Sequence, residues 1–281
     1  MSRASEVTRI EANVDLDFDW GTGFRLSRDE LAALIGRPKM SMLKYIDGGL
    51  GLVAVGRDSD AGWLNLAQRG LVRRGVNLDF GIGPFLQKFE LLLSTRQWMA
   101  ELRVNDPRLP VQCSHWFAAS ANGVAVIHTE VVGKEPKFWF ALLKHEDARK
   151  LLLFHLDLDQ LNSPPQIAKS FDLPLDAYIK LCRELVFDGV KLVDELLEGP
   201  AHCKEPHLFL EAIASAQARW MELTVERRTD QTFHCDRVGW GRCGVTGTWS
   251  FEIDEMERIR FDPLEPEVLK SNISRLIGDL S

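Results

Sequence analysis

The order of apolar and polar positions predicts a strand and two short helices in the first quarter of the chain. Val14–Trp20 alternates apolar with acidic residues, which is the period of a half-buried strand. Ser27, with Glu30 three positions later, is typical of a capping box at the start of a helix. A second helix is predicted over residues 61–69, with Gly70 just beyond its last turn.

The middle of the chain has the clearest pattern. Residues 85–95 form an amphipathic helical stretch, and residues 98–104 predict a strand. Two further predicted strands, 113–120 and 124–132, flank Asn122–Gly123, the dipeptide that most strongly favours a short hairpin turn. A strand at 137–143 and a helix at 145–154 are predicted next.

The second part of the chain repeats this order of elements. Residues 162–165 include two prolines and are the best candidate for a linker. Pro174 is expected in the first turn of a helix, and residues 176–197 form a long amphipathic helical run. The other predicted elements are a helix at 208–218, strands at 220–227, 231–239 and 246–253, and a last helix at 266–277.

The two parts also share a passage of similar sequence. Residues 85–104 read FLQKFELLLSTRQWMAELRV, and residues 209–225 read FLEAIASAQARWMELTV. Each opens a helix on Phe-Leu and continues through Trp-Met into Glu-Leu-x-Val in a predicted strand. We interpret this as an internal duplication, the alternative being a chance likeness between two amphipathic helix-to-strand units.

The duplication predicts an α+β fold. We expect two similar halves, residues 1–162 and 163–281, in a pseudo-twofold arrangement of antiparallel sheets with flanking helices. The sheets are expected either to join edge to edge or to pack face to face, because a long exposed edge strand favours aggregation. In both cases the halves form one compact unit with a shared sheet system.

Composition places the chain among ordinary soluble globular proteins. It has 281 residues, 45% of them hydrophobic and 27% charged, with 34 Lys and Arg against 41 Asp and Glu. A net charge of −7 argues against a nucleic-acid coat and against a polybasic membrane anchor. No secretory signal or membrane-spanning run is recognisable, so we expect a cytoplasmic protein without membrane insertion.

The negative charge is concentrated in one stretch. Phe251–Glu267 contains seven acidic residues against Arg258 and Arg260. Such a run is usually a solvated face, and it could also steer a basic partner towards the protein.

No pattern of cysteines and histidines has the spacing of a metal site. Zinc sites usually pair their ligands two to four positions apart, twice over, and the richest region of this chain does not. We therefore predict no metal and no cofactor, and reduced thiols. The residues of that region are His202, Cys203, His207, His234, Cys235 and Cys243.

Catalytic and DNA-binding motifs are equally weak. The chain has no phosphate-binding loop, no nucleophile elbow and no HExxH motif. The irregularly spaced His115, His128, His145 and His155 are each candidate general bases and are each more often packing residues. We predict no catalytic residue, although an enzyme with a His/carboxylate site stays open. Arg69–Arg74, after two short predicted helices, leaves a DNA-binding regulator as a further alternative.

Tryptophan is unusually frequent, with eight Trp against two Tyr. Most lie on predicted strands, where Trp normally belongs to the core. An exposed subset is expected to anchor a protein partner, because Trp is enriched in interface hot spots. The candidate partner-binding residues are Trp116, Trp139, Trp240 and Trp249.

The chain resembles the EspG-type cytosolic chaperones of ESX (type VII) secretion. The likeness rests on the leucine-rich helix Leu31–Gly36, on the passage Leu66–Gly75 (LAQRGLVRRG), and on Glu101–Val104 in a strand after a helix. It covers most of the chain. It implies a pseudo-twofold α+β fold around an antiparallel sheet and a non-catalytic adaptor that keeps secretion substrates soluble. No client-binding residue is carried over, because none lies in a matching motif.

From the residues and the resemblance together, we expect a cytoplasmic binding protein or chaperone for secreted protein clients. These clients are expected to be small helical proteins rather than nucleic acid. An enzyme of unknown reaction and a DNA-binding regulator are the alternatives.

Overall fold

A computed structural model describes most of the chain. The described residues are 22–35, 60–74, 80–105, 113–132, 135–163, 170–176, 218–229, 232–243 and 247–278. The predicted strand at 14–20 lies outside these ranges, as do all but the first residue of the helical run at 176–197 and all but the last residue of the helix at 208–218. No described helix is both long enough and apolar enough to cross a membrane.

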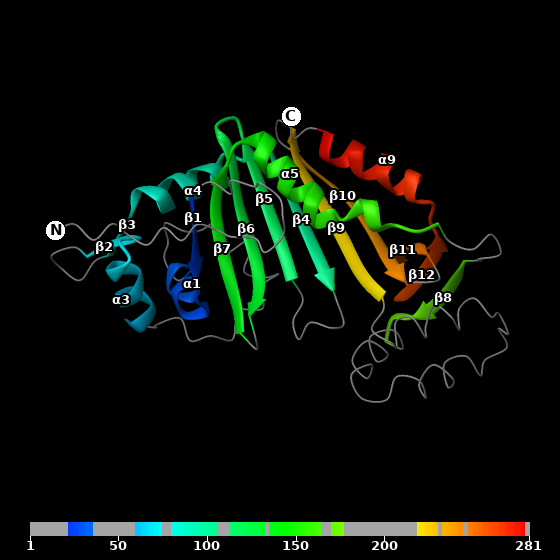
Figure 1. Cartoon of the computed structure of the whole chain (residues 1–281), viewed down its shortest axis with the longest axis horizontal. Coiled ribbons are helices and arrows are strands. Elements are labelled where there is room, and N and C mark those ends of the chain that lie inside the picture. Colours follow the sequence, from blue (N-terminus) through cyan, green and yellow to red (C-terminus); the bar gives the residue numbers. More distant parts are fainter. Residues whose placement is uncertain are drawn as a thin grey trace.

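One antiparallel sheet of ten strands forms the body of the molecule (Figure 1). Its strands lie side by side in the order β1-β7-β6-β5-β4-β9-β10-β11-β12-β8. Their bounds are β1 Thr22–Leu26, β4 Trp98–Asn105, β5 Cys113–Ser120, β6 Gly123–Val132, β7 Glu135–Leu143, β8 Phe171–Pro174, β9 Ala218–Thr229, β10 Thr232–Cys243, β11 Thr248–Ile253 and β12 Arg258–Pro263.

Five α-helices accompany the sheet within the described residues. They are α1 Arg28–Ile35, α3 Asp60–Gln68, α4 Pro84–Ser94, α5 His145–Leu156 and α9 Pro266–Ile277. A short 3-10 turn, η3 Leu158–Gln160, follows α5, and the strands β2 Val72–Arg74 and β3 Phe80–Ile82 form a small separate sheet. The α+β class predicted from the sequence is confirmed.

The elements with strong local signals were predicted correctly. These are α1, α3, α4, α5 and α9, and the strands β4 to β7 and β9 to β11. The prediction at Pro174 was wrong, because Phe171–Pro174 is the strand β8 at the edge of the sheet. The strands β1, β2, β3 and β12 were not predicted.

The middle of the sheet is the antiparallel pair β4 and β9, which joins strands far apart in sequence. Leu102 lies directly opposite Leu223, and Ala100 lies opposite Val225. Outward from this pair, β4 continues to β5, β6 and β7, and β9 continues to β10, β11 and β12. The strands on both sides of this pair therefore belong to one continuous sheet.

Helices α5 and α9 cover one face of the sheet, on the near side in Figure 1. Leu102 and Leu223 lie in the core beneath them, together with Leu152 of α5 and Ile273 of α9. Arg227 of β9 donates to the carbonyl oxygen of Leu276 at 2.6 Å and so satisfies an acceptor in the last turn of α9. This face therefore carries a continuous apolar core across the central pair of strands.

Helices α1, α3 and α4 pack on the opposite face, over the first half of the sheet. Phe89 of α4 and Phe140 of β7 have ring centroids 5.0 Å apart, and Leu34 of α1 belongs to the same apolar cluster. Because side chains alternate along a strand, β5 sends Phe117 to one core and Trp116 to the other.

The predicted capping box forms at the start of α1 and is bonded to the residue that follows α3. The Ser27 N–H donates to Glu30 Oε2 at 2.8 Å, and the Glu30 N–H donates to Ser27 Oγ at 3.2 Å. Arg69 adds two bonds to the carboxylate of Glu30, at 2.8 and 2.9 Å, and donates to the carbonyl of Arg25. Gly70 follows with φ of +72°, a conformation that favours glycine. The Arg-Gly-Leu-Val passage thus ties α3 to the start of α1.

Removing Arg69 should destabilise the fold, because the carboxylate of Glu30 is only 6% exposed and would lose its charged partner. Arg69 itself is one-third exposed, so we expect Arg69→Met to lower the free energy of unfolding by about 2 kcal/mol rather than more. Arg260→Met is the matched control, since its pair with Asp262 lies on the surface and should change stability by less than about 0.5 kcal/mol. Urea titration compares the two, and equal losses would contradict the assigned role of Arg69.

A glycine in the second half of the sheet leaves room for an aromatic side chain. A Cβ atom at Gly241 would overlap the indole of Trp220, whose ring packs against Phe251 and Phe261. Gly241→Ala should therefore cost about 1–3 kcal/mol through overpacking. Gly278→Ala is the control, because nothing lies within 4 Å of the added atom. A thermal melt that shows no difference between the two variants would argue against this packing constraint.

Candidate functional site

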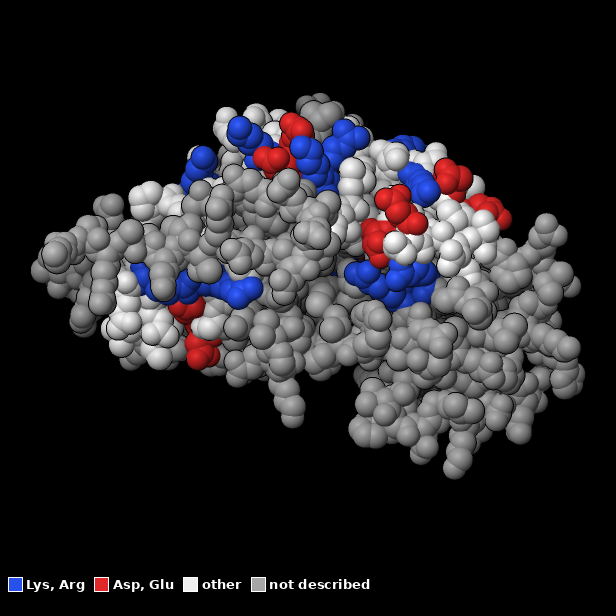
Figure 2. Space-filling view, viewed as in Figure 1, with Lys and Arg blue, Asp and Glu red and all other residues white. Residues whose placement is uncertain are grey.

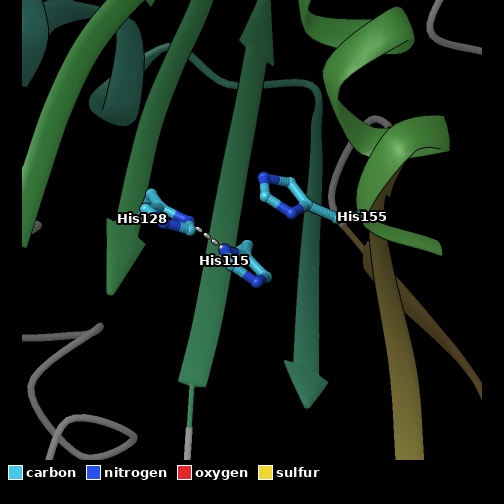
Figure 3. Close-up of side chains that lie close together, drawn as sticks. All are labelled: His115, His128 and His155. Carbon is cyan, nitrogen blue, oxygen red and sulfur yellow. Dashed lines mark hydrogen bonds between the residues drawn. The ribbon is translucent and has the colours of Figure 1, made fainter. Parts of the chain in front are cut away.

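Three histidines from separate elements meet on the face of the sheet that α5 covers (Figure 3). His115 on β5 and His128 on β6 lie directly opposite each other in register, and His155 reaches towards them from α5. The ring centroids are 4.3 Å apart for His115 and His128, 4.0 Å for His115 and His155, and 5.0 Å for His128 and His155. The three rings are nearly parallel, and the Nδ1 atoms of His115 and His128 share a hydrogen bond. We call these residues the histidine cluster.

Water reaches the three rings to different degrees, and His128 is partly exposed. His115 is buried, and the Nε2 atom of His155 is inaccessible to solvent although the residue as a whole is partly exposed. Burial, which disfavours the charged imidazolium, lowers the pKa of His115 well below 6.5, and His155, His128 and Arg219 lower it further. Burial, followed by His128 and Arg219, likewise lowers the pKa of His155. His115 and His155 are therefore neutral at pH 7.

A network of charged groups lies where α5 ends. Asp157 caps the helix in a left-handed conformation, with φ of 50° and ψ of 42°. Its Oδ2 atom accepts from Arg219 at 3.4 Å and from Arg242 at 3.0 Å. These contacts fasten the end of α5 to β9 and β10, so the network fixes the helix that presents His155 to the sheet.

The arrangement supplies neutral imidazole nitrogens, which can act as metal ligands or as general bases. The Asp157 carboxylate, two positions after His155, is engaged by two arginines. Taken one by one along the sequence, the three histidines do not predict the cluster. The predicted hairpin of β5 and β6 does indicate one contact. His115 and His128 are equally distant from the two-residue turn between Ser120 and Gly123, so the hairpin pairs them. Helix α5 supplies the third ring through packing that no local pattern shows.

The four tryptophans predicted as partner contacts all lie in the interior. Trp240 is completely buried beneath α5 and α9, and Trp116 belongs to the core on the other face. Trp139 lies under the Arg25 guanidinium, 3.5 Å from the ring centroid, and Trp249 packs against Phe171. Trp139 lies directly opposite His128 in the sheet, next to the histidine cluster, and the role of all four tryptophans as partner contacts stays a prediction.

The cysteine- and histidine-rich region considered as a metal site is only partly described. His234 and Cys235 are neighbours on β10 and are both exposed. Partial burial, with Glu226 and Asp236 nearby, raises the pKa of the Cys235 thiol. His202, Cys203 and His207 lie outside the described residues.

The turn between β11 and β12 is the second notable surface feature. Met256 at its tip is 81% exposed and Ile253 is 42% exposed. Four exposed acidic residues lie around them: Glu252, Asp254, Glu255 and Glu257. The Asp254 carboxylate fixes the turn by accepting from the N–H groups of Met256 and Arg258 at 2.9 and 2.8 Å. We call residues 252–257 the acidic hairpin.

Acidic and basic side chains are interspersed on the described part of the face seen in Figure 2. On the helices that cover this face, Lys150 pairs with Glu146 at 2.6 Å, and Lys270 pairs with Glu267 at 2.9 Å. The acidic hairpin therefore differs from the paired surfaces of α5 and α9.

Comparison with known proteins gives a likeness to solved structures but none to curated sequences. No protein-family model matches the chain, and no curated protein matches it significantly. Among solved structures, the chain is similar to the type VII secretion system chaperone EspG5 of Mycobacterium tuberculosis, solved in complex with the PE25–PPE41 dimer. The TM-score is 0.47 and the sequence identity is 10%, over 91% of this chain and 96% of that chain. EspG5 bears the name of the family that the sequence passages resemble.

Stability should depend on pH through the histidine cluster. Because the pKa values of His115 and His155 are lower in the folded state than in the unfolded chain, unfolding takes up protons as the pH falls below about 6.5. The free energy of unfolding should be constant above that pH and fall below it by up to about 2.7 kcal/mol per pH unit.

This dependence is measured by urea unfolding in EDTA between pH 7.5 and 5.0. His155→Leu should at least halve the slope, since it removes one depressed pKa and one neighbour of His115. His234→Leu, an exposed histidine outside the cluster, should leave the slope unchanged. The same slope in His155→Leu and in the unsubstituted protein would refute this origin of the pH dependence.

Proposed function

We propose that this protein is a non-catalytic chaperone or adaptor that binds secreted protein clients in the cytoplasm. The observation that carries the proposal is the acidic hairpin, where exposed apolar side chains lie among four exposed acidic residues. Isolated exposed apolar residues are ordinary on protein surfaces. Met256 differs because its backbone N–H donates a hydrogen bond to the Asp254 carboxylate and its side chain is almost fully exposed.

The chemistry of the hairpin indicates the kind of client. A methionine side chain is flexible and polarisable, so it adapts to apolar surfaces of different shapes. The surrounding carboxylates favour approach of a positively charged surface and raise the association rate. A turn that is already ordered loses little conformational entropy when it binds. These properties support an amphipathic helix with an apolar stripe flanked by Lys or Arg as the client element.

We infer that the sheet is built from two related halves, residues 1–162 and 163–281, around a pseudo-twofold axis. Support comes from the shared Glu-Leu-x-Val passage, in which Leu102 corresponds to Leu223, because these two residues are direct partners in the sheet. The order of strands outward from β4 mirrors the order outward from β9. A duplication that joins edge to edge in this way makes one wide sheet and leaves the acidic hairpin in the outer part of the second half.

The assignment to type VII-like secretion rests on the sequence resemblance at Leu31–Gly36 and Leu66–Gly75. Small helical secreted proteins are the proposed clients, and a dimer of the PE–PPE kind is the first candidate to test. Trp116, Trp139, Trp240 and Trp249 remain proposed partner contacts. Since all four are buried in this structure, we assign the first contact with a client to the acidic hairpin.

Co-expression with the small secreted helical proteins encoded beside the gene tests the proposal. A complex should survive size-exclusion chromatography, and Met256→Ser should weaken it by about tenfold or more, as expected for an anchor residue at an interface. Leu64→Gln is the matched control, because Leu64 is an exposed apolar residue on α3, in the first half of the chain, and it should leave the affinity unchanged. Circular dichroism should show both variants folded, since both positions are exposed.

Two outcomes would contradict the proposal. One is the absence of a complex with any of these neighbouring proteins. The other is a complex whose affinity falls equally in Met256→Ser and in Leu64→Gln, which would remove the acidic hairpin from the interface.

A further inference from the structure

We propose that His115, His128 and His155 form a binding site for one transition-metal ion, with Zn²⁺ as the best match, between the sheet and α5. The proposal is independent of client binding and concerns the first half of the chain. It rests on the convergence of three nitrogen ligands from three elements that other contacts already hold in place.

The positions of the three side chains are fixed by the fold. His115 and His128 form a cross-strand pair in a hairpin whose register is set by the turn after Ser120. Opposite residues on one face of an antiparallel pair have Cβ atoms only about 5 Å apart. On the helix, Leu151 and Leu152 pack into the core beneath α5, and Asp157 is bonded to β9 and β10. His155 lies between these anchors and faces the pair (Figure 3).

The distances are close to those of a metal site. One ring nitrogen from each histidine can be chosen so that all three lie within 4.8 Å of one another. Nitrogen ligands at about 2.0–2.1 Å from a tetrahedral Zn²⁺ are about 3.3 Å apart. Movements of about 1 Å, through rotation of the rings about their side-chain bonds, close the difference. Because the rings are now nearly parallel, binding must turn at least one of them so that its lone pair faces the common centre.

The ligand type selects the class of ion. Three imidazole nitrogens suit Zn²⁺, Cu²⁺ and Ni²⁺, whereas Mg²⁺ and Ca²⁺ prefer oxygen ligands. The nearby Arg219 acts electrostatically on His115 and His155, and Asp157 offsets part of its charge by accepting from it at 3.4 Å. A three-histidine set leaves the fourth tetrahedral position for water or for an added ligand. In this protein the bound ion would fasten α5 to β5 and β6.

The test uses the full-length protein after removal of metal with EDTA and exchange into chelator-free buffer. Isothermal titration with Zn²⁺ should give one site per chain, with a dissociation constant of about 1 µM or tighter. Zinc should also raise the melting temperature, since it binds the folded state. Co²⁺ as a spectroscopic substitute should develop the visible absorption bands of a four- or five-coordinate nitrogen site.

Variants locate the site. His115→Gln, His128→Gln and His155→Gln should each weaken Zn²⁺ binding by about 100-fold or more, since loss of even a supporting partner of a ligand costs about 10–100-fold. His145→Gln, on the same helix but outside the cluster, and His234→Gln, exposed on β10, should bind as the unsubstituted protein does. His128 is only partly buried, so its variant should stay folded if the His115 variant does not.

The proposal is overturned if the stripped protein takes up less than half an equivalent of Zn²⁺ at 10 times the expected dissociation constant. It is also overturned if the folded His128→Gln variant binds Zn²⁺ with unchanged affinity. Loss of binding in His234→Gln instead would place the ion on the surface of β10.

Discussion

The antiparallel pairing of β4 with β9 is the interaction on which the rest of the structure depends. It joins strands more than a hundred residues apart into one sheet, with Leu102 opposite Leu223. Side chains alternate strictly along a strand, so this register decides which residues face α5 and α9. A slip of β9 by one position against β4 would turn Leu223 out of that core and bring a neighbouring residue such as Glu222 into it. The same pairing leaves β1 and β8 as the two edges of the sheet.

The histidine cluster and the acidic hairpin follow from this constraint at different distances from the centre. The strands next to β4 carry their alternation outward, so His115 and His128 fall on the same face as Leu102. Helix α5 must cross that face to cover the apolar side chains, and it brings His155 with it. The acidic hairpin joins β11 to β12, two strands beyond β9. Its residues are exposed to solvent, so this turn needs no helix to cover it. The histidine cluster therefore lies between the sheet and a helix, whereas the acidic hairpin protrudes from the sheet.

How much the sequence predicts depends on how local the deciding interactions are. The capping box of Ser27 and Glu30, the turn after Ser120 and the helix beginning at Pro266 are set by neighbours in sequence, and all three were predicted. Strand β8 was not, because Pro174 permits a first helical turn and only the pairing of Phe171 with Phe261 makes the segment extended. Strand β12 was not predicted either, although its pairing with β11 is local. The histidine cluster combines both cases, since the hairpin pairs two histidines locally and α5 adds the third only through tertiary packing.

A cluster of buried imidazoles has a cost that the fold must offset. A leucine at the buried position of His115 would contribute apolar burial, whereas a buried imidazole must find partners for its nitrogens or lose free energy. His115 and His128 satisfy one nitrogen each by bonding to each other, which is possible only for one donor and one acceptor. Protonation cannot supply more bonds without bringing charge beside Arg219. A divalent ion, by contrast, accepts a lone pair from every ring at once and leaves the opposite nitrogen of each ring as a donor. The convergence of ring nitrogens from β5, β6 and α5 therefore fits the proposed set of metal ligands.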